Sequence, residues 1–174
     1  MTTELSFEAA LAASQTLVTA MAEQTLTADQ IQDQVAQLVQ SETGARGFFV
    51  TYLTGPDWVE PPPAFILQAL AQSPEIVSEL LVKNLAMATA MALTHRRNQD
   101  ETNAQGSDQV QRRTQALLLA LALPPMQEKL QQLAQSIEQP TGAYQDFLAR
   151  WGYDSEQKQV ILQALTPVLA SFSR

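Results

Sequence analysis

The sequence predicts an all-α fold, a single-domain helical bundle of about seven to eight helices around a central helical hairpin. Three observations predict it. Residues 73–97 carry a long helical pattern with no glycine, and their one proline stands at the first helical position. Most other segments repeat their apolar residues every three or four positions, which is the period of a helix. Outside residues 45–53 no stretch offers a second strand for a sheet.

Residues 73–97 are the element around which the others are placed. Ser73 can cap the N-terminus with its hydroxyl, and Pro74 suits the first helical position, where its missing N–H has no helical partner. Arg96 and Arg97 fall in the last turn, where positive charge complements the helix macrodipole. At 1.5 Å per residue this helix would be roughly 35 Å long.

Two helices are expected before residue 44. Ser6 can cap the first, and Thr27 opens the second with Gln30 three positions later, which is the spacing of a capping box. Gly44 is expected in the stop region of the second helix. Residues 54–63 hold four prolines and one glycine, so they indicate a turn-rich connector, and a short helix follows before Ser73.

Residues 45–53 fit two structures. Phe48, Phe49 and Tyr52 have the spacing of a helix, whereas their abundance of β-forming residues also suits a strand. We favour the helix because no partner strand is available. The same three aromatic residues are candidates for the lining of a ligand pocket, although packing in a core is the commoner role of such rings.

Residues 98–108 are polar, and we expect them to form a flexible loop that a partner could order on binding. A helix should then start at residue 107 or 108. Its end, residues 117–123, is strongly apolar and is expected to be buried against the second half of the central helix in an antiparallel hairpin. Further helices are expected beyond Pro124 and Pro125. We expect residues 1–174 to form one all-helical domain.

The charge distribution limits the classes of partner. The net charge is −8, and residues 1–60 hold eight acidic residues and one basic residue. An acidic surface repels phosphate backbones and anionic lipid, so we expect no nucleic acid and no membrane surface as partners. The apolar stretch 117–123 is far shorter than the roughly 20 residues of a membrane span, and no span is expected. The N-terminus lacks the basic region of a signal peptide, which favours a cytoplasmic location.

Metal and thiol chemistry have little basis in this sequence. There is no cysteine, which excludes disulfides, thiolate nucleophiles and iron–sulfur clusters. His95 is the one histidine, and it could serve as a haem ligand, a metal ligand or a general base. A single nitrogen ligand makes a weak metal site, however, and Ala92 stands where a Glu-x-x-His pair needs its glutamate. We therefore expect no metal and no cofactor, and a structural role for His95 near the helix C-terminus.

Four arginines form the strongest candidate surface. Arg96, Arg97, Arg112 and Arg113 flank the polar segment 98–108, and an antiparallel hairpin would bring them to one end of the bundle. Such a cluster could bind an anion or an acidic protein partner. The alternative is local neutralisation by the three acidic residues of the loop, since exposed ion pairs carry little specificity.

Three stretches together resemble a known family: GARGFFVTYLTGP (44–56), SPEIVSELLVKNLAMATAMALTHRRNQ (73–99) and FLARWGYDSEQK (147–158). They are similar to a family of small uncharacterised proteins of cyanobacterial type, over most of the chain from about residue 40 onward. The resemblance implies a soluble bacterial protein. It assigns no catalytic or binding role to any residue.

The function predicted from these features is that of a non-enzymatic protein-interaction or scaffold protein. Its contact surface would be the arginine end of the hairpin or a helix face rich in Gln and Ala, and a homodimer is one form the interaction can take. The alternative is a protein that binds a haem, pigment or lipid between helices, with His95 and Phe48, Phe49 or Tyr52 at the pocket. An enzyme is not expected, because no catalytic constellation is present.

Overall fold

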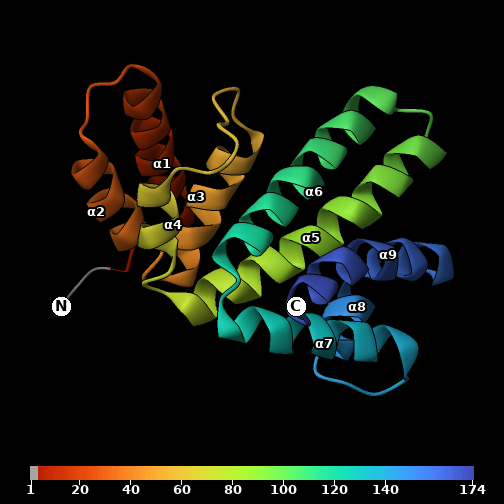
Figure 1. Cartoon of the computed structure of the whole chain (residues 1–174). Coiled ribbons are helices and arrows are strands. Elements are labelled where there is room, and N and C mark those ends of the chain that lie inside the picture. The colour runs from red at the N-terminus through yellow and green to blue at the C-terminus, as the bar shows by residue number, and fades with distance from the viewer. Residues whose placement is uncertain (1–3) are drawn as a thin grey trace. The chain divides into compact units, whose positions relative to one another are not determined.

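The computed structural model of the chain describes residues 4–174, and within them the backbone forms nine α-helices and no strand (Figure 1). This confirms the all-α class. In chain order the helices are α1 (Phe7–Ala22), α2 (Ala28–Leu38), α3 (Glu42–Thr54), α4 (Ala64–Leu70), α5 (Pro74–Arg97), α6 (Glu101–Leu121), α7 (Pro124–Glu138), α8 (Gln145–Trp151) and α9 (Ser155–Ser171). The chain divides into two compact units, residues 1–80 (unit 1) and 81–174 (unit 2), with the boundary inside α5. That residues 1–174 form a single domain remains a prediction.

Unit 1 contains α1 to α4 and the first residues of α5. Both N-caps predicted here are present. The Ser6 hydroxyl accepts a hydrogen bond from the Ala9 N–H at 3.2 Å, and Thr27 and Gln30 form the reciprocal capping box of α2. Caps of this kind join residues within a single turn, so their sequence signature is independent of the rest of the fold.

Helix α3 covers residues 45–53, which confirms the helical alternative for this segment. It begins earlier than expected, because Ser41 caps it by accepting a hydrogen bond from the Gly44 N–H at 3.0 Å. Gly44 therefore lies in the first turn of α3 and does not end α2. A Cβ atom at this position would lie 2.0 Å from the carbonyl oxygen of Leu38, so the glycine is needed for close backbone approach.

Helices α1 and α3 also approach closely, at Ala10 and Gly47. A Cβ atom on Gly47 would lie 2.8 Å from both the carbonyl carbon and the Cβ of Ala10, closer than packed carbon atoms tolerate. Both residues are buried, and Leu17 is buried further along α1. This contact decides which side of α1 faces the interior of unit 1.

Substitution of Gly47 by alanine is expected to destabilise the protein by about 1–2 kcal/mol. The clash with Ala10 costs more than the roughly 1 kcal/mol that alanine gains over glycine in a helix. Urea unfolding followed by circular dichroism measures the change. Gly106→Ala is the matched control, because Gly106 lies in the second turn of α6 and a Cβ there meets nothing within 4 Å. The control should be stabilised by about 0.5–1 kcal/mol, and equal effects of the two substitutions would contradict the close-approach explanation.

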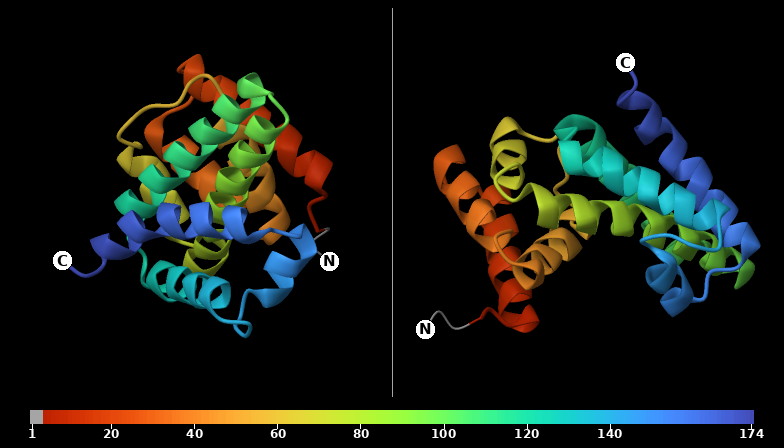
Figure 2. Two further views of the ribbon diagram at one scale, coloured as in Figure 1. Left: turned by 90° about the vertical axis from the view of Figure 1, so that its right-hand side faces the viewer. Right: turned by 90° about the horizontal axis from the view of Figure 1, so that it is seen from below.

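Unit 2 is built on an antiparallel hairpin, formed by residues 81–97 of α5 and by α6, which run side by side in both figures (Figures 1 and 2). The connection is only residues 98–100. The prediction of a flexible loop over residues 98–108 is therefore wrong. Asp100 caps α6 by accepting a hydrogen bond from the Asn103 N–H at 3.1 Å, and Gln99 takes the left-handed conformation that turns the chain.

The polar composition of residues 101–108 belongs to the exposed side of a helix. Ala104 is the apolar residue of this turn, and it is fully buried. The polar residues around it, at 101–103 and 105, face water. A solvated helix face and a solvated loop have similar compositions, so composition alone did not distinguish them.

The apolar end of α6 is buried on one side only. Leu117 and Leu118 are fully buried, as expected, but Leu119 is 47% exposed. The expected neighbour is wrong, however: in an antiparallel hairpin that turns at residues 98–100, the end of α6 lies beside the first part of the 81–97 segment and not beside its second half (Figure 1). Ala122 then adopts a left-handed conformation and ends the helix, and α7 starts directly at Pro124. Proline is favourable in a first helical turn, because no helical acceptor is available there for its missing N–H.

Side chains of α7 and α8 close the turn between these two helices. The Ser136 hydroxyl accepts a hydrogen bond from the Tyr144 N–H at 3.0 Å, and the Gln145 amide donates to the carbonyls of Ser136 and Gln139. Helix α8 consequently begins at Gln145. Helix α9 continues through Pro167, which leaves the Gln163 carbonyl without its usual helical donor.

Helix α5 is long and apolar enough to cross a membrane by length and composition alone. Of its most apolar 18-residue window, 56% is buried within the structure, and the core helix of a soluble protein passes the same test. The prediction that the chain has no membrane span stays a prediction.

Candidate functional site

The structure does not bring the four candidate arginines together. Because α6 begins at Glu101, Arg112 and Arg113 lie about 17 Å along its axis from the tip of the hairpin. Arg96 and Arg97 stay at the tip, in the last turn of α5. Arg112 is exposed beside a shallow hollow on α6, whereas Arg113 is buried, with 6% of its surface exposed.

Arg96 joins the two helices of the hairpin. Its guanidinium donates to both carboxylate oxygens of Asp108, at 3.1 and 2.5 Å, and to Glu101 at 3.2 Å. The hydrogen bond to Asp108 is the largest cause of a pKa for Arg96 above its usual range, with Glu101 next. A bidentate pair of this geometry neutralises the arginine within the chain.

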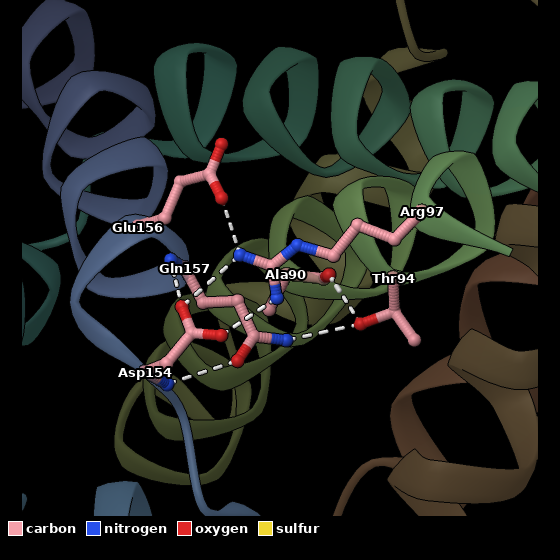
Figure 3. A network of polar contacts seen from close by, with 6 residues as sticks. All are labelled: Ala90, Thr94, Arg97, Asp154, Glu156 and Gln157. Carbon is pink, nitrogen blue, oxygen red and sulfur yellow. Dashed lines mark hydrogen bonds and ion pairs between the residues drawn. The ribbon is translucent and has the colours of Figure 1, made fainter.

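Arg97 joins α5 to the start of α9 (Figure 3). It donates to the two carboxylate oxygens of Asp154, at 2.6 and 3.3 Å, and it also donates to Glu156. The Asp154 carboxylate accepts a further hydrogen bond from the Gln157 N–H at 2.9 Å and so caps α9. The pKa of Asp154 falls to about 2, first because of the Arg97 hydrogen bonds and then because of the bond from Gln157.

Gln157 extends this network back to α5. Its side-chain oxygen accepts from the Asp154 N–H at 3.0 Å, which completes a capping box, and its side-chain nitrogen donates to the Thr94 hydroxyl at 3.0 Å. Thr94 in turn donates to the Ala90 carbonyl at 3.1 Å. We call the group Thr94, Arg97, Asp154, Glu156 and Gln157 the α5–α9 clasp. Its polar groups are paired with one another, so it has the geometry of a structural joint.

His95 and the aromatic candidates belong to different units. His95 is half-buried near the end of α5, where its backbone carbonyl accepts a hydrogen bond from the Asp100 N–H at 2.8 Å. Phe48 and Phe49 are buried in unit 1 with ring centroids 5.5 Å apart, and the Tyr52 ring stacks on Phe48 at 5.1 Å. These three rings fill the core around α3 by packing on one another.

The exposed side of α1 is another candidate surface besides the arginines. The sequence predicted a contact face rich in Gln and Ala but did not indicate which helix carries it. We call this exposed side of α1 the α1 outer face, and its members share one side of the helix at spacings of three and four residues. They are Ala12, Gln15, Thr16, Thr19, Ala20 and Glu23, which line a shallow hollow of about 500 Å³. All are exposed except Ala20, which is half-buried.

Charge is neutralised differently in different parts of the chain. The eight acidic residues of segment 1–60 are all exposed, and none of them forms an ion pair among residues 4–174. At the hairpin tip, by contrast, Asp108 and Asp154 pair with arginines. No group of three or more His, Cys, Asp or Glu suited to a metal ion occurs in the described part of the chain.

A comparison with protein families supports the resemblance noted in the sequence. The profile of a family described as Uncharacterised conserved protein UCP020893 matches residues 6–168. The match includes all of α1, which lies outside the stretches that carried the resemblance. A cyanobacterial source stays a prediction. No curated protein and no solved structure matches this chain.

The α5–α9 clasp predicts a pH-dependent contribution to stability. Asp154 has a pKa of about 2 in the folded protein against an ordinary value of 3.8. Because folding lowers this pKa, the contribution is fully present above about pH 4 and is lost as the pH falls through about 2. Asp154→Asn removes the charge but keeps a good N-cap. The variant should lower the urea midpoint at pH 6, with a much smaller difference from wild type near pH 2.

Asp33→Asn is the control for this comparison, since Asp33 is exposed on α2 and has no ion pair among the described residues. Its effect on the urea midpoint should be small at both pH values. If Asp154→Asn shifted the midpoint equally at pH 6 and near pH 2, the ion pair with Arg97 would not be the cause of its effect.

Proposed function

We propose that this chain, which belongs to the family described as Uncharacterised conserved protein UCP020893, is a non-enzymatic protein-interaction protein that binds its partner through the α1 outer face. The proposal keeps the predicted class of function and chooses the Ala- and Gln-rich helix face over the arginine cluster.

One observation carries the proposal: α1 lacks the charged residues that normally keep an exposed helix face in water. Glu8 is the one charged residue among its 16. The exposed side of α1 is polar yet weakly charged, and its small residues allow another helix to approach closely. Helix α1 buries Ala10, Ser14 and Leu17 within the structure, while the opposite side remains open to solvent.

The polar atoms of the α1 outer face are suited to being covered. The Thr16 hydroxyl donates to the Ala12 carbonyl of its own helix at 3.0 Å, so its hydrogen bond would survive the loss of water. Alanine and threonine also lose little side-chain entropy on burial, and their small size allows a second helix to approach closely. Covering these small residues would therefore cost little, whereas Gln15 and Glu23 would need polar or charged partners on the other protein.

The other candidate surfaces have weaker support. Arg96 and Arg97 are neutralised by carboxylates of the same chain, so binding an acidic partner would require these pairs to break. The alternative of haem, pigment or lipid binding assigns a pocket to Phe48, Phe49 and Tyr52, whose rings are packed in the core of unit 1. A purified protein with a visible absorption band that His95→Ala abolishes would favour this alternative.

Site-specific photo-cross-linking tests the proposal. A photoreactive amino acid replaces Thr16 in the middle of the α1 outer face, and irradiation of host cells should give a covalent adduct with another polypeptide. The control places the same amino acid at Gln34, an exposed position on α2. Adducts should form at Thr16 and be absent or much weaker at Gln34. Equal labelling at the two positions, or none at Thr16, would reject the α1 outer face as an interface.

A further inference from the structure

Acidic residues stand at both ends of the α1 outer face. Glu8 lies in the first turn of α1, and Glu23 is the C-cap. Both lie on the same side of the helix as Ala12 and Thr16, at successive spacings of three or four residues. The two carboxylates are therefore separated by about 22 Å along the axis, with small uncharged side chains between them.

The position of Glu23 at the C-terminal end of α1 is electrostatically unfavourable for the helix. The C-terminal end of a helix carries partial negative charge, which a carboxylate destabilises and a basic residue would stabilise. No basic residue occurs in the last turn of α1. Glu23 also lacks an ion pair among the described residues. Stability of the isolated chain therefore gives no reason for this carboxylate, whereas a positively charged group on a partner does.

The same arrangement opposes pairing of this face with a second copy. In an antiparallel pair, Glu8 of one copy would lie near Glu23 of the other, and in a parallel pair each glutamate would lie near its own counterpart. Like charges meet in both cases, which disfavours association. The surrounding segment 1–60 adds to the repulsion, since it holds eight acidic residues and one basic residue.

We infer that the occupant of the α1 outer face is a basic helical segment of another protein, with small residues in its centre and Lys or Arg near both ends. This inference rests on the proposed function and specifies the partner's chemistry. The basic residues lie about four turns apart, so that they meet Glu8 and Glu23 together. Small central residues let the partner helix approach closely over the small side chains between Ala12 and Thr19.

The protein itself can serve as the probe. The double variant Glu8→Lys with Glu23→Lys converts the α1 outer face into the basic surface expected of the partner. Wild type alone and the double variant alone should each remain monomeric, because like charges meet in both homodimers. Their mixture should form a 1:1 heterodimer in sedimentation velocity at low salt, with an association constant at least about tenfold above that of either protein alone. Added salt should weaken it.

A second variant tests the geometry independently. Glu23→Lys alone makes the face self-complementary in the antiparallel orientation, because Glu8 of each copy then meets Lys at position 23 of the other. This single variant should dimerise by itself. The control is the double variant Asp29→Lys with Asp33→Lys, which reverses two exposed charges on α2 outside the face. It should stay monomeric and should not associate with wild type. Circular dichroism confirms that every variant remains helical.

The outcomes separate the two proposals. If wild type is a dimer and Thr16 cross-links to a second copy, the α1 outer face is an interface but the basic partner is wrong. If Thr16 gives adducts and the charge-reversed variants nevertheless fail to associate, the basic partner is again wrong while the proposed function stands. If neither adducts at Thr16 nor heterodimers form, both are rejected. Adducts at Thr16 together with a salt-sensitive heterodimer support both.

Discussion

The close contact between Gly47 and Ala10 is the constraint on which the candidate site depends. A helix presents to solvent whatever side its packing leaves uncovered, and α1 is packed on α3 through the side that bears Ala10. The missing Cβ at Gly47 lets the two backbones meet at a distance that no other residue permits. Ala12, Thr16 and Thr19 then face outward as a direct consequence. The stability of unit 1 and the composition of its exposed surface are thus set by the same contact.

Charges in this protein have two separate roles. At the hairpin tip, carboxylates and guanidiniums pair with one another, and the Arg97–Asp154 pair also supports the capping box of α9. These groups hold helices together and have little capacity left for a partner. In segment 1–60 the carboxylates are exposed and have no ion pair among the described residues, so their field extends into solvent. The part of the chain whose carboxylates have no ion pair among the described residues also carries the weakly charged α1 outer face.

The sequence was informative about local structure and less so about the site. The Ser6 cap, the Thr27–Gln30 capping box and the helix over residues 45–53 were all predicted, because each depends on residues within a few turns. The arginine cluster was predicted from residues up to 17 positions apart. It does not form, because the connection between α5 and α6 is only residues 98–100 and not the predicted 98–108. A shift of a few residues in the start of a helix moves every later residue along its axis. The one signal of the α1 outer face was a scarcity of charge in the first helix.

By itself the sequence determined the all-α class, the helix caps, the absence of thiol chemistry and the acidity of the first 60 residues. These follow from composition and from interactions between neighbours in the chain. Only the tertiary structure decided that residues 101–108 are helical, that Arg113 is buried while Leu119 is exposed, and which side of α1 meets solvent. Each of these depends on contacts between residues far apart in the chain. A polar helix face and a polar loop, or the two sides of an alanine-rich helix, differ only in what packs against them.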